Sequence, residues 1–253
     1  MGKRCPVDKI LSIGCGEGSL ERHLATLNAF KDLDAVDISP ERVEKAREKA
    51  RENNLTGINY FIQNIETENF PQKDYDAIFY NMSLHHMFHM ETIICKTIDS
   101  LKPNGFLFIN EYVGPNRFEF SNREQEVIQS LYSLIPEKYR YSLAEQNFGY
   151  LKSQVSLPNP SEVANIDPSE AVCSKEIIPT LQKYCNIIEL NKIGGTVLQF
   201  LLQNIAGHFR EDDPESVSIL NLILKAEEIL IDIGDLESHF ALIVAQPKSP
   251  VQI

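Results

Sequence analysis

The sequence lacks three features that would place it in a membrane, in a secretory compartment or in a disulfide-stapled class. No apolar run approaches the roughly 18 residues that a membrane span needs. No apolar signal-peptide pattern follows Met1. The five cysteines include no C-x-x-C pair and show no regular spacing, so reduced thiols are expected. We therefore predict a cytoplasmic protein with no membrane partner.

Positive charge is also scarce. The chain has 24 Lys and Arg against 36 Asp and Glu, a net charge of -12, and no run of basic residues. Such a surface repels phosphate backbones, which argues against nucleic acid as a partner. The basic residues that do cluster, in "ERVEKAREKARE", alternate with glutamate at helical spacing and indicate a solvated helix face.

What the chain does have is a regular alternation of short apolar runs and helical patterns. At 253 residues, of which 43% are apolar, it can bury one sizeable core, and a single domain over 1–253 is expected. The alternation predicts an α/β fold whose mostly parallel sheet is covered on both faces. The predicted strands are 9–14, 33–39, 58–64, 75–81, 106–112, 186–195 and 238–247. The predicted helices are 19–30, 39–54, 90–101, the later part of 114–142, 167–185, 196–209 and 213–234.

Two segments interrupt this rhythm, 113–170 and 194–236. Insertions at the carboxyl ends of strands are where α/β sheets place ligand contacts, so both segments are predicted to form a lid or a substrate-binding layer. The apolar helical patterns at 196–209 and 215–233 have three interpretations, which are an extended core, a lid, or pairing with a second copy as a homodimer.

A glycine loop in "ILSIGCGEGSL" follows the first predicted strand and precedes the first predicted helix. Gly14, Gly16 and Gly18 give the spacing G-x-G-x-G, whereas the dinucleotide fingerprint needs a glycine where this chain has Ser19. The loop alone is also compatible with a tight turn that binds nothing. Asp37, at the end of the second predicted strand, favours a nucleoside, because its carboxylate can accept two hydrogen bonds from a ribose diol.

A further polar residue follows the third predicted strand. The Asn64 side chain can accept a hydrogen bond from an adenine amino group, and the Ile65 N–H can face a ring nitrogen. The alternative is that Asn64 is an ordinary turn residue.

Five segments, taken in order, resemble the successive motifs of class I S-adenosylmethionine-dependent methyltransferases. They are "ILSIGCGEGSLERHL", "LDAVDISPERVEKAR", "FIQNIE", "YDAIFYNMSLHHM" and "LKPNGFLFINEY". The resemblance implies a Rossmann-like, seven-stranded, mostly parallel sheet with an antiparallel last strand. It also implies S-adenosyl-L-methionine as the cofactor.

Carried over position by position, the resemblance implies a cofactor-binding set. Its members are Ser12, Gly14, Cys15, Gly16, Gly18, Asp37, Ile38, Asn64, Ile65 and Asn81. The glycines would wrap the methionine and ribose part, Asp37 would hold the ribose hydroxyls, and Asn81 would lie near the methionine amino group.

The chain departs from the family pattern at three places. Ser12 stands where the first motif usually carries an acid, and Asn64 stands where an acid usually contacts adenine. About nine residues precede the first predicted strand, whereas the family usually has a helix or more there.

The candidate catalytic residues follow the fourth and fifth predicted strands. In "NMSLHHM", His85 and His86 lie at the expected rim of the cofactor pocket, and an imidazole suits a general base at neutral pH. We prefer His85 as the base. Glu111 could orient a histidine, act as a base itself, or pair with Arg117. No metal site is predicted, because Asn81, Asn110 and Glu111 would make a poor cage for Mg²⁺.

The segment after the fourth predicted strand also limits the possible classes of substrate. "NMSL" differs from the Asn/Asp-Pro-Pro-aromatic tetrad of enzymes that methylate base amines. Aromatic side chains in 112–150 suit a small organic acceptor or a glycan, although they also suit a core of the insertion itself. O-methylation of such an acceptor is the leading interpretation. N- or C-methylation, a non-catalytic S-adenosylmethionine-binding protein and an NAD-dependent oxidoreductase are the alternatives.

Overall fold

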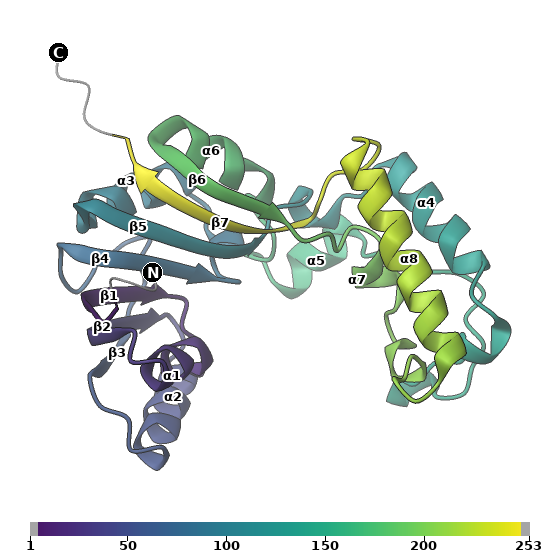
Figure 1. Ribbon diagram of the computed structural model, residues 1–253, viewed down its shortest axis with the longest axis horizontal. Helices are drawn as coiled ribbons and strands as arrows, with labels where there is room; N and C mark the ends of the chain where they lie inside the picture. The colour runs from purple at the N-terminus through teal and green to yellow at the C-terminus, as the bar shows by residue number, and fades with distance from the viewer. Residues whose placement is uncertain (1–4, 249–253) are drawn as a thin grey trace. The chain divides into compact units, whose positions relative to one another are not determined.

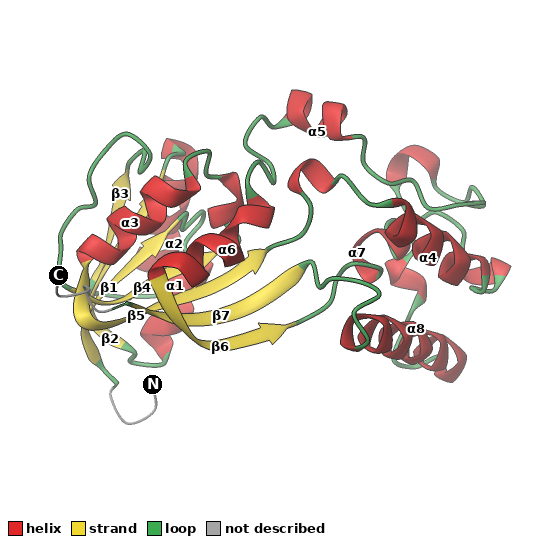
Figure 2. Cartoon of the chain, turned by 90° about the horizontal axis from the view of Figure 1, so that it is seen from above, coloured by secondary structure: helices red, strands yellow, loops and turns green. Residues whose placement is uncertain are grey.

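The computed structural model of the chain describes residues 5–248 and contains one seven-stranded sheet (Figures 1 and 2). The strand order is β3-β2-β1-β4-β5-β7-β6, and β7 runs antiparallel to the rest. The strands are β1 Val7–Ile13, β2 Phe30–Asp37, β3 Ile58–Ile62, β4 Tyr75–Asn81, β5 Leu101–Tyr112, β6 Cys185–Lys192 and β7 Phe240–Pro247. The predicted fold class and all seven strands are confirmed.

The helices alternate with these strands along the first half of the chain. They are α1 Ser19–Thr26, α2 Pro40–Glu52, α3 Met90–Ser100, α4 Asn122–Ser133, α5 Pro160–Ile166, α6 Ile177–Tyr184, α7 Leu198–Leu201 and α8 Pro214–Asp232. The single 3-10 turns are η1 Leu84–His86, η2 Asn116–Phe118, η3 Glu137–Tyr139, η4 Glu145–Asn147, η5 Ser174–Glu176 and η6 Ala206–His208. Helix α2 begins where the sequence predicts, because Ser39 accepts a hydrogen bond from the Arg42 N–H at 3.3 Å and Pro40 follows it.

The sheet is buried on both faces because neighbouring residues of its central strands belong to different apolar clusters. In β1, Ile10 packs with α1 and α2, whereas Leu11 packs with α3 and α6. In β4, Ala77 belongs to the cluster of Ile10, and Ile78 belongs to the cluster of Leu11. Successive side chains of a strand point to opposite faces, so the near-continuous apolar runs of these strands fill two cores.

Three of the helix predictions were wrong in extent. The helix predicted over 19–30 ends at Thr26, and Phe30 already begins β2. The segment predicted as a helix over 196–209 contains only α7 and the turn η6, because Asn204 takes a left-handed conformation (φ 64°). The Asn204 carbonyl then accepts a hydrogen bond from the Leu143 N–H at 2.7 Å instead of continuing a helix. The helix predicted over 167–185 begins only at Ile177, because residues 167–173 form a loop.

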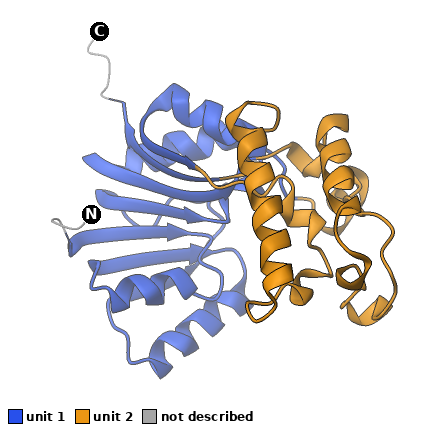
Figure 3. Cartoon of the chain, turned by 45° about the vertical axis from the view of Figure 1, so that its right-hand side comes forward, with its two compact units in different colours: residues 1–113, 169–191, 241–253 blue, residues 114–168, 192–240 orange. Residues whose placement is uncertain are grey.

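The chain divides into two compact units (Figure 3). The first holds the sheet and comprises 1–113, 169–191 and 241–253; the second comprises 114–168 and 192–240. The second unit has its own core, in which Phe120, Tyr132 and Tyr139 are buried. Phe148 and Tyr150, by contrast, are exposed. The insertion's aromatic residues therefore serve mainly its own core, as the alternative interpretation expected. That these segments act as a lid stays a prediction.

Two predictions concern the surface of the chain. Among residues 5–248, no helix combines the length and apolarity needed to cross a bilayer. Helix α8 exposes several apolar side chains, Leu222, Leu224 and Ile229 among them. The homodimer stays a prediction.

Candidate cofactor and active site

The glycine loop between β1 and α1 requires glycine for two physical reasons. Gly14, Gly16 and Gly18 all have positive φ values, of 70°, 54° and 76°. A Cβ atom on Gly18 would lie 2.5 Å from the Tyr60 hydroxyl, and one on Gly14 would overlap the Cβ atom of Ser83. The loop is therefore pressed against β3 on one side and against the turn after β4 on the other.

Asp37 fixes the shape of this loop. One oxygen of its carboxylate accepts a hydrogen bond from the Gly16 N–H at 2.8 Å, and the other accepts from the Ser39 N–H at 2.9 Å. A carboxylate has about four lone-pair sites, so these two bonds leave it able to accept from a diol. The predicted neighbour Ile38 has an exposed side chain (66%) beside this carboxylate.

The remaining predicted cofactor residues lie at the carboxyl ends of β3 and β4. The Asn64 side-chain oxygen accepts a hydrogen bond from the Glu66 N–H at 3.0 Å, which makes it a turn residue. Ile65 is buried, and Asn81 is exposed. The Asn81 side-chain oxygen accepts from the Asn110 amide at 2.8 Å, so these two amides engage each other.

Ser12 pairs with an acid that the sequence analysis did not single out. Its hydroxyl donates to the carboxylate of Glu21 on α1, and both residues are buried. Burial is the main cause that raises the pKa of Glu21. Burial, followed by the Glu21 and Asp37 carboxylates, also raises the pKa of the Cys15 thiol. A carboxyl therefore does lie beside Ser12, where the first motif of the family usually has one, but a helix supplies it.

His85 and Glu111 form a buried pair at the start of η1. The His85 Nδ1 atom lies 2.6 Å from one oxygen of Glu111, and the two residues are 4% and 0% exposed. The other Glu111 oxygen accepts hydrogen bonds from the N–H groups of Ser83 and Leu84, each at 2.5 Å. The Ser83 hydroxyl donates to the Ile13 carbonyl at 2.6 Å, which ties this turn to the glycine loop. The structure thus brings Glu111 to His85, whereas the Arg117 guanidinium donates to the carbonyls of Asp167 and Pro168.

His86 faces a segment that sequence reasoning missed. Its Nδ1 atom lies 3.1 Å from the Ser169 hydroxyl, and its Nε2 atom lies 3.9 Å from the Glu170 carboxylate. The Val172 N–H donates to the His85 carbonyl at 3.1 Å, which fixes this segment beside η1. The helix predicted over 167–185 concealed this loop.

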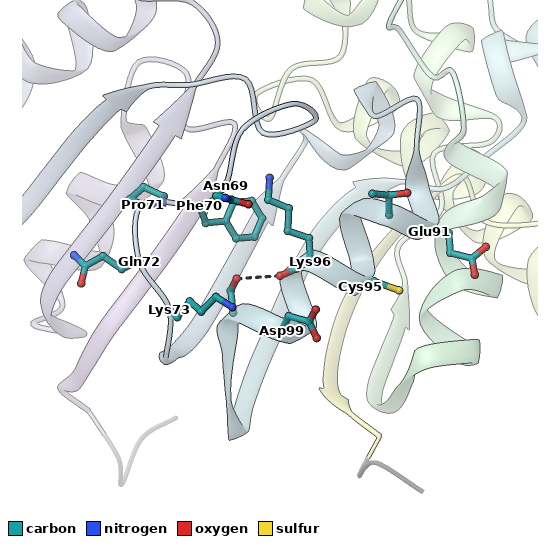
Figure 4. A pocket seen from close by; sticks show the side chains of 11 residues that line it. Asn69, Phe70, Pro71, Gln72, Lys73, Glu91, Cys95, Lys96 and Asp99 are labelled. Atoms are coloured by element: carbon teal, nitrogen blue, oxygen red, sulfur yellow. Dashed lines mark hydrogen bonds between the residues drawn. The ribbon is translucent and has the colours of Figure 1, made fainter.

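A separate pocket of about 710 Å³ opens between residues 69–73 and α3 (Figure 4). Lys96 lies over the Phe70 ring there, with its ammonium 4.6 Å from the ring centre, and it donates to the Ile65 carbonyl at 2.6 Å. None of the predicted site residues lines this pocket. The hydrogen-bonded residues around the glycine loop and η1 are therefore the better candidate for the chemistry.

Comparisons with known proteins agree with this arrangement. The profile of a methyltransferase-domain family matches residues 10–105, which include the glycine loop, Asp37 and the two histidines. A demethylmenaquinone methyltransferase of Tropheryma whipplei is 29% identical over 111 residues, which are 44% of each chain. A malonyl-[acyl-carrier protein] O-methyltransferase of Priestia megaterium is 26% identical over 73% of this chain and 58% of its own.

The structure is similar over most of its length to a solved protein, the [4+2]-cyclase SpnF. The TM-score is 0.55 at 16% identity, and the match covers 97% of this chain and 77% of the cyclase, which shows a common fold.

The fold is the Rossmann-like fold of methyltransferases, with a seven-stranded sheet and an antiparallel β7. Over residues 10–105 the chain carries a methyltransferase domain of the class I type, whose methyl donor is S-adenosylmethionine. It spans about half the length of the curated relatives that it matches. The profile match includes the glycine loop, and it favours a methyltransferase over a dinucleotide-dependent oxidoreductase there.

Proposed function

We propose that this protein transfers the methyl group of S-adenosylmethionine to a hydroxyl oxygen of a small molecule or glycan, with His85 as the general base. The observation that carries the proposal is the buried contact of 2.6 Å between His85 Nδ1 and Glu111. A carboxylate that accepts from Nδ1–H fixes the tautomer whose lone pair is on Nε2, which is the form that a base needs.

The residues of the loop fit a nucleoside cofactor. The backbone around Gly16 has no side chain in the way, and the Asp37 carboxylate, already bonded to the loop, can accept from a ribose diol. The ionised Glu21 would favour a cation nearby. When bound, S-adenosylmethionine supplies a methyl group on a positively charged sulfur.

The protein's own task is then to place the acceptor and to remove its proton. The acceptor oxygen forms the new bond to carbon, the carbon–sulfur bond breaks with its electrons going to sulfur, and the hydroxyl proton passes to His85 Nε2. Glu111 stabilises the resulting imidazolium, because it is an anion held by two backbone N–H groups. A base is most needed for an oxygen acceptor, because the hydroxyl loses its proton as the new bond forms.

The test is a turnover assay with isotopically labelled methyl donor and a panel of hydroxylated acceptors, read by mass spectrometry. In His85→Gln, turnover should fall by about 10²–10⁴-fold, which is the usual contribution of a general base. His23→Gln, which alters an exposed histidine on α1, is the matched control and should keep full turnover. Equal turnover in His85→Gln and in the wild type would refute the role of His85.

A non-catalytic binding protein is the second candidate. The departure at Ser12 motivates it, because the first motif of the family usually carries an acid at that position. Tight binding of S-adenosylmethionine without release of S-adenosylhomocysteine, with any acceptor of the panel, would favour this candidate over the first.

A further inference from the structure

Three side chains beside the glycine loop converge in a way that the proposed methyl transfer does not require. His85, His86 and Glu170 each offer one ligand atom, and these atoms lie within 4.8 Å of one another. The Nε2 atoms of the histidines lie 3.8 Å and 3.9 Å from the two oxygens of Glu170. The carboxylate therefore faces both imidazoles at once.

Each histidine is oriented through its other nitrogen. Nδ1 of His85 engages Glu111 at 2.6 Å, and Nδ1 of His86 engages the Ser169 hydroxyl at 3.1 Å. Metal-bound histidines are held in this way, because a carboxylate or other polar partner on one nitrogen fixes the ring and makes the other nitrogen a better ligand.

The spacing is close to that of a coordinated ion. Bonds of about 2.0–2.1 Å to nitrogen or oxygen in a tetrahedral site place neighbouring donors roughly 3.4 Å apart. The separations of 3.8 Å and 3.9 Å involve the two different oxygens of Glu170, and each exceeds that spacing by about half an ångström. With one ligand atom from each residue, the separations reach at most 4.8 Å, which is about 1.4 Å above that spacing. Rotation of the Glu170 side chain, which is 30% exposed, and a small turn of the partly exposed His86 ring would bring the three atoms to one ion.

The donor set also selects a class of ion. Two imidazoles and one carboxylate suit zinc and neighbouring transition metals, whereas Mg²⁺ and Ca²⁺ prefer oxygen donors alone. Glu170 and His86 are partly exposed, so solvent reaches the site. Three protein ligands leave further coordination positions for water.

We propose that His85, His86 and Glu170 bind one divalent transition-metal ion, with zinc as the best match. The lone pair on His85 Nε2 can either coordinate the ion or accept a proton, but not both at once. The consequence for activity, which rests on the proposed function, is that the bound ion inhibits methyl transfer by occupying the base.

Cobalt(II) is the probe, because it reports its own coordination in the visible spectrum. The full chain is treated with a chelator, dialysed and titrated with Co²⁺, and Zn²⁺ is then added to displace it. We expect one equivalent of Co²⁺ in the wild type and a loss of binding of at least about tenfold in His86→Gln and Glu170→Gln. His89→Gln, which removes an exposed histidine next to the same turn, should bind like the wild type.

Three outcomes separate the site from the proposed function. If the variants bind Co²⁺ like the wild type while their thermal unfolding is unchanged, the proposed site is wrong. If Zn²⁺ shields His85 and His86 from diethyl pyrocarbonate, as read by peptide mass spectrometry, the site is supported independently of any acceptor. If Co²⁺ binds as expected but leaves turnover unaltered, the metal site stands and the role of His85 as base is refuted.

Discussion

Replacing Glu21 with glutamine exchanges a buried carboxyl for a neutral amide of nearly the same shape. Glu21 is fully buried, and one of its oxygens accepts from the Ser12 hydroxyl. Within residues 5–248, the other oxygen has no hydrogen-bond partner. Burial is therefore the largest influence on the pKa of Glu21, which lies above its ordinary value of 4.5. An ionised carboxylate in this place destabilises the fold.

The raised pKa of Glu21 makes the free energy of unfolding depend on pH. Above pH 4.5 the unfolded chain releases the Glu21 proton before the folded chain does, so the free energy of unfolding falls as pH rises toward the folded pKa. Each tenfold difference between the two ionisation constants is worth about 1.4 kcal/mol. For a chain of this size, that corresponds to a change in Tm of roughly 3–6 °C.

The assay is thermal unfolding without cofactor, measured from about pH 5.5 to about pH 8.5 in the wild type and in Glu21→Gln. The Tm of Glu21→Gln should rise relative to that of the wild type as pH increases, and the difference should level off above the folded pKa. Glu41→Gln is the control, because Glu41 is exposed and pairs with Lys45 at 2.9 Å. Its Tm difference from the wild type should show no such rise.

Bound S-adenosylmethionine should reduce or reverse the Tm difference by which Glu21→Gln exceeds the wild type. A bound sulfonium or ammonium cation favours the ionised form of Glu21, so S-adenosylmethionine should raise the Tm of the wild type more than that of Glu21→Gln at about pH 8. Parallel Tm curves for the two proteins across the whole pH range would refute the reasoning about burial. Equal protection by the cofactor would refute the link to the binding site.

Three further predictions concern the loop, a thiol and the second unit. Gly18→Ala should lower the free energy of unfolding by about 1–3 kcal/mol more than Gly149→Ala does. Both glycines have positive φ, but only a Cβ atom at Gly18 would meet Tyr60 and Ala46. Equal losses of Tm in the two variants would contradict this. Cys15 should react with a thiol reagent at least about tenfold more slowly than the exposed Cys5, because burial raises the pKa of Cys15 and the thiolate is the nucleophile. Peptide mass spectrometry measures the two labelling rates, and equal rates would contradict the prediction. Glu227→Ala should cost about 1–3 kcal/mol in urea unfolding, because its buried carboxylate accepts from the Val197 N–H at 2.6 Å; an unchanged midpoint would show that this bond contributes nothing.

The sheet could be predicted from local patterns because its strands are buried on both faces. Runs such as Ile10–Ile13 and Ala77–Tyr80 are almost wholly apolar, and the glycine loop and the Ser39 cap mark where the next helices begin. These signals need no knowledge of distant contacts. The helix predicted over 196–209 failed for the opposite reason, since a bond from Leu143, some 60 residues earlier, captures the Asn204 carbonyl.

Some contacts of the candidate site could likewise be predicted from the sequence, and others could not. The His85–Glu111 contact could be anticipated, because the carboxyl ends of neighbouring parallel strands meet at one edge of the sheet. Glu170 could not, since it lies in a loop that local pattern assigned to a helix and reaches the histidines only through the fold. The partner of Ser12 was nine positions away, but no periodicity distinguishes a buried Glu21 from a solvated helix acid.

The second unit is assembled from two stretches of chain that leave the sheet at separate points, and its single core draws on both. Phe120 and Ile128 come from the first stretch, whereas Phe200 and Ile223 come from the second. A recombination event that carried only one stretch into another family member would import half of an apolar interior. Exchange of this unit between relatives therefore demands four coordinated crossovers, two for each stretch, and laboratory chimeras should be cut at all four junctions together.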